Sequence, residues 1–199
     1  MKKLTCSFSM LLLILCQGAV TAQSFQKGQV DLNLGIGLGN TIIGPGNSST
    51  TPPLSISLGY GITRDISIGG YLGYTATSYL YNGWDDCGNG QGNGQYFTDT
   101  YRWSYLIVGV VADYHFGRFI PNEKVDVYAG LLLGNDFATS HYSTTSFCPD
   151  HVGYAEQTYG GVVLSLHAGV RYHFTPRFGL FGELGYGISY LNMGVTFKF

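Results

Sequence analysis

The sequence is poor in charge and lacks long hydrophobic runs. Of its 199 residues, only 10 are Lys or Arg and 12 are Asp or Glu. It carries no basic patch of the size that binds nucleic acid, so we expect no nucleic-acid partner. No stretch reaches the ~20 consecutive apolar residues that a transmembrane helix needs, so we expect no helical membrane anchor. Cysteine is also scarce, with four in the chain.

The N-terminal residues predict a secretory signal peptide. Lys2 and Lys3 form a basic start, residues 10–15 are apolar, and Val20-Thr21-Ala22 is a small-residue cleavage site. We therefore expect residues 1–22 to be removed and residues 23–199 to form one domain. Without the two leader lysines, 8 basic and 12 acidic side chains remain, a net charge of −4.

Glycine and aromatic residues are abundant and favour strands and turns. The chain has 30 Gly, 16 Tyr and 12 Phe. The last nine residues show the clearest pattern, because Leu191, Met193, Val195, Phe197 and Phe199 alternate with Asn192, Gly194, Thr196 and Lys198. A strict period of two predicts a strand with one apolar and one polar face.

The same alternation recurs along the chain and predicts eight strands. They lie at residues 30–38, 54–62, 66–76, 101–116, 125–134, 162–174, 180–186 and 191–199. We expect long loops at 39–53, 78–99 and 136–157, an intermediate turn at 117–124, and short connections at 63–65, at 175–177 and near Ser189. Long and short connections alternate as in an all-β, eight-stranded antiparallel up-and-down transmembrane β-barrel with short periplasmic turns and longer extracellular loops.

The fourth predicted strand is ambiguous. Ile107 and Val111 are apolar but fall out of phase with the other apolar residues of that strand. A β-bulge and a partly apolar lumen both explain this, and the sequence does not choose between them.

Side-chain volume favours a membrane barrel over a soluble one such as a lipocalin-type carrier. One phase of the strands holds Leu, Val, Ile and aromatic residues, and the other is rich in Gly with a few charged residues. A soluble barrel would need to expose the Gly-rich, charge-poor set to water. Lipid instead requires an uncharged apolar exterior, and a narrow lumen suits small side chains.

Aromatic residues gather at predicted strand ends, as in interfacial girdles. Tyr114, Phe116, Tyr172, Phe174, Phe197 and Phe199 are expected at one end, and Tyr74, Tyr159 and Tyr186 at the other.

Several short segments resemble one known family. They are Tyr114-His115-Phe116, Tyr172-His173-Phe174, Tyr128-Ala129-Gly130, Glu183-Leu184-Gly185-Tyr186-Gly187 and Phe197-Lys198-Phe199. Over the whole mature chain, the sequence resembles the outer-membrane β-barrel domain family of small eight-stranded proteins from Gram-negative bacteria. Its ending on Phe197 and Phe199 resembles the signal by which such proteins are recognised for assembly. The resemblance implies residence in the outer membrane, in contact with lipid and lipopolysaccharide, and delivery by the barrel-assembly machinery.

Five charged residues fall on the inward phase and are expected to form a lumen network: Asp31, Asp126, Arg171, Glu183 and Lys198. A buried charge in a narrow barrel must be paired. Counting from the turn at 175–177 places Arg171 and Glu183 about one diagonal step apart, within reach of long side chains. Asp31 and Lys198 are expected to meet where the first and last strands close the barrel. We interpret the network as structural; an ion path is the alternative, which a filled lumen disfavours.

No catalytic, cofactor or metal site is predicted. His141-Tyr142-Ser143 resembles the His-x-Ser spacing of an outer-membrane lipid A deacylase, and an imidazole there would activate the hydroxyl. The segment lies in a predicted loop, and no carboxylate partner is evident. His115, His167 and His173 are interpreted as packed lumen residues.

Cys87 and Cys148 lie in different long loops, and the oxidising periplasm makes a disulfide between them plausible. The same loops are acidic and aromatic, which suggests contact with an extracellular partner or with lipopolysaccharide through divalent ions; plain solvated loops are the alternative.

We therefore expect a monomeric, non-enzymatic barrel with a structural or surface-interaction role. A lipid-modifying enzyme and a small-solute pore are the alternatives.

Overall fold

The structure is a closed barrel of eight antiparallel strands, in which β1 pairs with both β2 and β8. It is a computed structural model that describes residues 25–41, 48–85, 95–120, 122–146 and 157–199. The strands are β1 (Val30–Asn40), β2 (Ser48–Gly61), β3 (Ile66–Asp85), β4 (Gln95–His115), β5 (Val125–Thr144), β6 (Gln157–His173), β7 (Phe178–Gly185) and β8 (Ser189–Lys198). A 3-10 turn, Gly117–Phe119, lies between β4 and β5. Each strand pairs with its neighbours in sequence order, as predicted.

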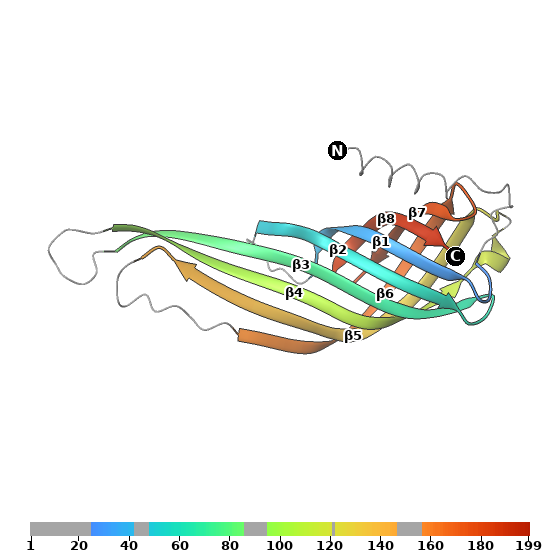
Figure 1. Cartoon of the computed structure of the whole chain (residues 1–199), viewed down its shortest axis with the longest axis horizontal. Helices are drawn as coiled ribbons and strands as arrows, with labels where there is room; N and C mark the ends of the chain where they lie inside the picture. Colours follow the sequence, from blue (N-terminus) through green and yellow to red (C-terminus); the bar gives the residue numbers. More distant parts are fainter. Residues whose placement is uncertain (1–24, 42–47, 86–94, 121, 147–156) are drawn as a thin grey trace, which may run out of the picture.

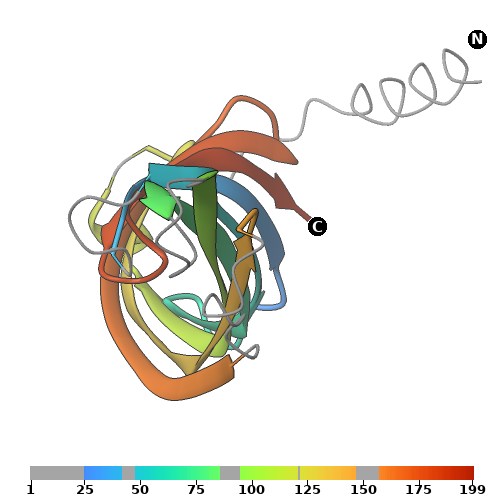
Figure 2. The ribbon, with the colours of Figure 1, turned by 90° about the vertical axis from the view of Figure 1, so that its left-hand side faces the viewer.

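The two ends of the barrel differ. Figure 1 shows β3, β4 and β5 projecting past the other strands at one end, whereas short connections join the strands at the opposite end. We call the second end the turn end; β1 begins and β8 stops there, and the Phe199 amide donates to the Val30 carbonyl at 2.9 Å. Viewed along the barrel from the projecting end, the strands form a closed ring (Figure 2).

Strands β3 to β6 are longer than the sequence predicts. Much of the expected loop at 78–99 is strand, because β3 extends to Asp85 and β4 starts at Gln95, and the first part of the expected loop at 136–157 is strand, because β5 runs to Thr144. The expected loop at 39–53 also shortens, since β2 begins at Ser48. These predictions were wrong because they relied on apolar alternation, which a strand needs only where one face meets an apolar environment.

The ambiguity in β4 is resolved in favour of a partly apolar lumen. Its register with β3 and β5 is continuous from Asp99 to Tyr114, without a bulge. Ile107 and Val111 point inward and pack with Leu132 and other apolar residues. Register shifts occur instead between β2 and β3, on either side of Thr51.

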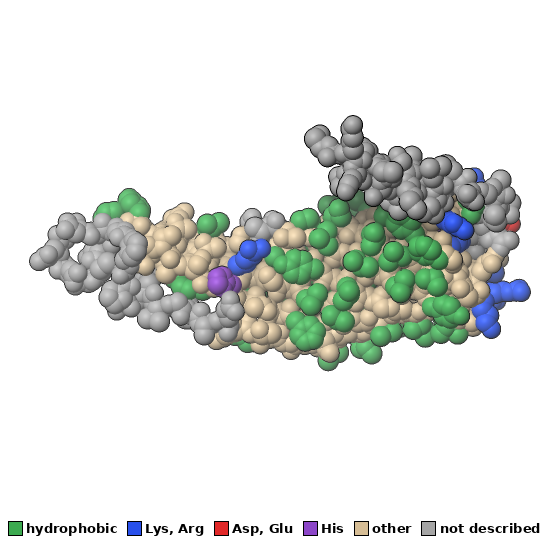
Figure 3. Space-filling model, viewed as in Figure 1, with side chains coloured by type: hydrophobic (Ala, Val, Ile, Leu, Met, Phe, Trp, Pro, Cys, Tyr) green, Lys and Arg blue, Asp and Glu red, His purple; other side chains and the backbone are tan. Residues whose placement is uncertain are grey.

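The outer surface of the barrel is apolar and its interior polar, the reverse of a soluble barrel. Hydrophobic side chains cover the barrel between its two ends, and basic side chains gather at the turn end (Figure 3). Ile36, Leu58 and Val110 are typical, each 52–55% exposed. Inside, small residues let the strands approach: a Cβ on Gly69 or Gly194 would collide with a carbonyl oxygen of the neighbouring strand. Bulky residues therefore point outward, as predicted.

Aromatic rings contact one another around the turn end, as in an interfacial girdle. Tyr114 contacts Phe116 and Tyr172 contacts Phe174, with ring centroids 5.0 and 5.1 Å apart. Phe178 joins the second pair to Phe197. At the other end Tyr186 is outward and exposed. Tyr159 departs from the prediction, because it shares the inward face of its strand with Val163.

Candidate functional site

An ion network fills the lumen near the turn end. Asp126 is its centre: its Oδ2 accepts from Arg171 Nη1 at 2.8 Å, and its carboxylate lies 3.0 Å from His115 Nδ1. The Asp31 carboxylate is 3.6 Å from the same Arg171 nitrogen. All four side chains are at most 3% exposed. The charges compensate one another, as low-dielectric burial requires.

Residues that precede β1 close this network off. The Gln29 amide donates to Asp31 at 2.6 Å, and the Phe25 ring stacks on His115 with centroids 3.6 Å apart and an interplanar angle of 1°. The Gly28 amide donates to the Gly61 carbonyl at 2.8 Å, which ties this segment to β2. The mouth of the barrel at the turn end is therefore filled by the chain itself.

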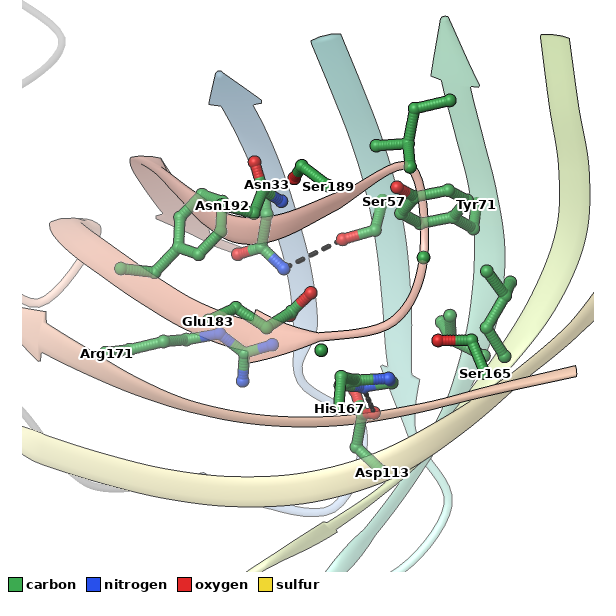
Figure 4. Close-up of a pocket in the computed structure, with 16 residues that line it drawn as sticks. Asn33, Ser57, Tyr71, Asp113, Ser165, His167, Arg171, Glu183, Ser189 and Asn192 are labelled. Atoms are coloured by element: carbon green, nitrogen blue, oxygen red, sulfur yellow. Dashed lines mark hydrogen bonds and ion pairs between the residues drawn. The ribbon is translucent and has the colours of Figure 1, made fainter. Parts of the chain in front are cut away.

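A second polar layer lies directly above the first. The Tyr128 hydroxyl donates to Glu183 Oε2 at 3.0 Å, and His167 Nε2 lies 2.7 Å from Asp113 Oδ1. The Arg171 guanidinium links the layers, because its carbon sits 4.0 Å from the centroid of the Tyr128 ring. Figure 4 shows Asp113, His167, Arg171 and Glu183 converging from β4, β6 and β7.

The partners in this network differ from those predicted. Arg171 lies opposite Phe181 and Glu183 opposite Gly169, so Arg171 and Glu183 are one diagonal step apart. The hydrogen bond of Arg171 nevertheless goes to Asp126. Asp31 and Lys198 do face each other across the β1–β8 closure. Sequence reasoning missed Asp113 and Tyr128. Asp113 was not assigned to the lumen because the inward phase of β4 was ambiguous. Tyr128 was interpreted as an ordinary strand tyrosine, although it shares the inward phase of Asp126.

The lumen histidines are buried. His115 and His167 each face a carboxylate, while both ring nitrogens of His173 are buried without a hydrogen-bond partner. Within the described ranges, no group of three or more His, Cys, Asp or Glu residues is arranged to hold a metal ion.

An apolar layer seals the lumen above the ion networks. Its members are Tyr71, Ile107, Val111, Leu132 and Ile188, with Val163 packed against them. Between this layer and the polar residues lies a cavity of about 30 Å³ (Figure 4). That volume holds an isolated water molecule but not a continuous column of water. The barrel interior is a packed core, as expected for eight strands.

Beyond the apolar layer, four strands continue as a projecting wall. We define this wall as residues 75–85 of β3, 95–105 of β4, 136–144 of β5 and 157–163 of β6. β2 pairs with β3 only as far as Ser78, and β7 pairs with β6 only as far as His167. Past Ser78 and Gln157 the wall is a single sheet of β3, β4 and β5, which Figure 1 shows projecting past the other strands.

The inward face of the wall carries an aromatic cup of about 330 Å³. The residues that line the cup are Tyr101, Trp103, Ser140, His141, Tyr142, Gln157 and Tyr159. Tyr101 and Tyr142 lie opposite each other with ring centroids 4.9 Å apart, and Trp103 lies 6.3 Å from Tyr159 at an interplanar angle of 28°. Sequence reasoning missed the cup because its residues fell in or beside predicted loops.

The candidate His-x-Ser pair lies on a strand, not in a loop. His141 and Ser143 are exposed residues of β5, and the positions opposite them on β4 are Arg102 and Thr100. Neither is a carboxylate, so the cross-strand neighbours on β4 supply no acid that would orient the imidazole. Cys87 and Cys148 lie outside the described residues, and their disulfide stays a prediction.

Comparison with known proteins identifies the class of this barrel. The sequence matches the model of the outer membrane protein beta-barrel domain over residues 8–198. No curated protein matches it. Nowhere in the described part of the chain is there a helix with the length and apolarity needed to span a bilayer.

Solved structures agree in fold. OprG from Pseudomonas aeruginosa superposes with a TM-score of 0.53 at 10% identity, covering 89% of this chain and 98% of that one. The N-terminal barrel domain of OprF from the same organism gives 0.49 at 16% identity, over 87% and 98%. Ail, the attachment invasion locus protein of Yersinia pestis, gives 0.49 at 12% identity, over 87% and 100%. The chain belongs to the outer membrane protein β-barrel domain family and resides in the bacterial outer membrane.

Proposed function

We propose that the barrel is a sealed, non-enzymatic membrane anchor that presents the projecting wall for binding at the cell surface. The single observation that carries this proposal is the division of the molecule. Its lumen is filled from the turn end to the apolar layer. Strands β3 to β6 continue past that layer and carry solvent-exposed aromatic side chains.

The exposed aromatic residues of the wall favour a binding role. Tyr96 is 78% exposed and packs edge-on against Trp84, with centroids 4.6 Å apart. Tyr79, Leu80 and Tyr81 are also exposed on β3. Large aromatic side chains held on paired strands lose little entropy on binding, and they dominate the energetics of protein interfaces.

The orientation follows from the connections. Short turns join the strands at one end and the projecting wall occupies the other, and in outer-membrane barrels the short turns face the periplasm. The wall would then stand on the extracellular side, next to lipopolysaccharide. A monomer suffices for this role, because one chain completes both the barrel and the wall.

The two other candidate functions have weaker support. A pore needs a continuous water path, which the apolar layer and the 30 Å³ cavity do not offer. A lipid A deacylase needs an oriented imidazole, and the residues opposite His141 and Ser143 do not supply a carboxylate. Planar-bilayer conductance and lipid A mass spectra test these two candidates separately.

Shortening the β3–β4 hairpin tests the binding role. Tyr81 and Asp99 are paired, so residues 82–98 can be replaced by Asn-Gly, the two-residue turn that suits antiparallel strands. Whole cells displaying the intact or the shortened protein would be compared for adherence to epithelial monolayers and to lipopolysaccharide-coated beads. We expect the shortened protein to reach the surface in equal amount but to lose adherence. Equal adherence to both surfaces would refute the proposal.

A further inference from the structure

We propose that the aromatic cup binds an organic cation with a quaternary ammonium head group. This inference rests on the proposed surface-binding function and names the chemistry that one part of the wall recognises. A site for such a cation needs ring faces that surround the ligand, negative charge nearby and a volume that matches the head group.

The sheet register builds the enclosure. Trp103 pairs with Ser140, which in turn pairs with Gln157, so a small side chain forms the centre of that row. The row below places Ala138 between Tyr105 and Tyr159. Aromatic rings therefore flank the small side chains of Ser140 and Ala138, and the space between the rings is the cup.

Tyr101 and Tyr142 close the cup on the side away from the membrane. Their rings are tilted by 49°, so they converge rather than stack flat. Tyr101, Trp103 and Tyr142 are each half-buried by their neighbours, which holds the rings in place before a ligand arrives. Such preorganisation lowers the entropic cost of binding.

The charge around the cup is negative. On the inward face of the wall, within residues 75–83, 97–105, 136–144 and 157–163, the charged side chains are Asp99 and Asp136. Arg102 alternates to the outer face. His141 borders the cup from the end of the β5–β6 pairing, which stops at Ser140. The ring faces and the carboxylates together attract a cation and repel an anion.

Of the two carboxylates, Asp99 accepts a hydrogen bond from Tyr142 and keeps one oxygen without a donor. Asp99 is 5% exposed, and its Oδ1 atom is buried without a hydrogen-bond partner. Asp136 lies below the cup, where its Oδ1 is 2.8 Å from the point that a Cβ on Gly161 would occupy. A buried carboxylate oxygen without a donor is costly unless a cation compensates it.

The volume fits a small ligand. At about 330 Å³, the cup lies at the lower end of the range for small-molecule sites. A trimethylammonium group is weakly hydrated and presents methyl groups to several rings at once, which is the geometry of an aromatic cage. A neutral sugar also stacks on rings and donates hydroxyl hydrogen bonds to carboxylates, but it brings no positive charge, so maltose serves as the competing probe.

Fluorescence of Trp103 offers a direct test. The chain has two tryptophans, and Trp84 lies in the segment that hairpin shortening removes, so the shortened protein reports on the cup alone. The purified shortened protein, which keeps the whole barrel and the cup, would be titrated with choline chloride in a polyoxyethylene detergent without charged head groups. Matched titrations would use sodium chloride, the uncharged isostere 3,3-dimethyl-1-butanol, and maltose.

We expect a saturable change with choline and binding at least tenfold weaker for the isostere. Tyr159→Leu and Asp136→Asn should each weaken choline binding by about 2- to 30-fold, the range that corresponds to one cation–π or charge contact. In the full-length chain, followed by calorimetry, Tyr60→Leu on the exposed outer face of β2 should leave choline affinity unchanged. Equal binding of choline and its isostere, binding of maltose alone, or no binding of any probe would each overturn the inference.

The two proposals fail in different ways. If choline does not bind but shortening the hairpin still abolishes adherence, the cation site is refuted and the surface-binding function stands. If adherence survives shortening while choline binds through Tyr159, the cup is a ligand site and the adherence function is refuted.

Discussion

The turn-end half of the barrel is a ring of all eight strands, whereas the projecting wall is built from four of them, β3 to β6, under opposite constraints. In the barrel half, Asp126 and Arg171 are buried in a ring of strands whose outer faces are apolar. In the wall, β3 to β6 form one sheet that carries polar and aromatic side chains on both faces. Lipid outside and a closed lumen inside dictate alternation in the first region. The wall is subject to neither constraint, so its strands need not alternate.

This contrast assigns stability to one region and recognition to the other. Every strand of the barrel half has two hydrogen-bonded neighbours, whereas β3 and β6 each lose one neighbour in the wall. Contacts inside the lumen should therefore dominate the free energy of unfolding. Substitutions in the wall should act mainly on binding.

The largest effect is expected for Asp126→Asn. The change removes the charge that compensates Arg171 and faces His115, leaving a buried guanidinium with the more distant Asp31. Breaking a buried pair in this way costs about 3–5 kcal/mol. Urea unfolding in detergent micelles, followed by tyrosine fluorescence and gel mobility, measures it.

Asp65→Asn is the matched control. Asp65 pairs with Arg118 on the exposed surface of the turn end, where solvent screens the interaction. If the two Asn variants unfold at the same urea concentration, the lumen network does not contribute more than a surface pair, and the comparison fails.

Truncation of the apolar layer should come next. Ile107 is 1% exposed, so Ile107→Ala is expected to cost about 2–5 kcal/mol through lost contacts and a cavity. Leu80 lies on the wall and is 59% exposed, so Leu80→Ala should change the unfolding free energy by less than about 0.5 kcal/mol. The same urea titration compares them, and similar losses for both would contradict the division of roles.

Removing both charges tests whether the lumen network is coupled. In the double variant Asp126→Asn with Arg171→Met, the uncompensated guanidinium is absent. We expect the double variant to lose less stability than the two single variants together, with a coupling energy of about 0.5–3 kcal/mol, the size seen for residues in contact. A purely additive result from the four unfolding curves would show that Arg171 draws its stabilisation from elsewhere.

Much of the barrel half was predictable, because every one of its strands alternates. Leu191 to Phe199 alone define an outward and an inward face of β8, and the structure pairs these residues with β1. The pairing of Arg171 was not predictable. It depends on the stagger of β5 against β6, which sets Asp126 opposite Arg171, and alternation does not fix a stagger.

The wall and its cup were hidden for a different reason. Ser140, Tyr142 and Gln157 belong to segments without a continuous apolar face, and such segments look like loops in a sequence. Their strand pairing continues from the barrel below, where the register is already set. Tyr159 was predicted to lie in the outer girdle. The register of β5 with β6 instead places it on the inward face, where it contacts Trp103.

Deleting the tip of the wall is expected to change the stability of the barrel only slightly. Replacing residues 82–98 by Asn-Gly removes the tip of the wall, where Trp84 and Tyr96 contact each other rather than the barrel. Shortening a connection also lowers its closure entropy slightly. The unfolding free energy should therefore change by less than about 1 kcal/mol, although seventeen residues are lost where Asp126→Asn alters one side chain. A loss as large as that of Asp126→Asn would mean that the wall and the barrel unfold as one cooperative unit, and the separation of anchor from recognition surface would not hold.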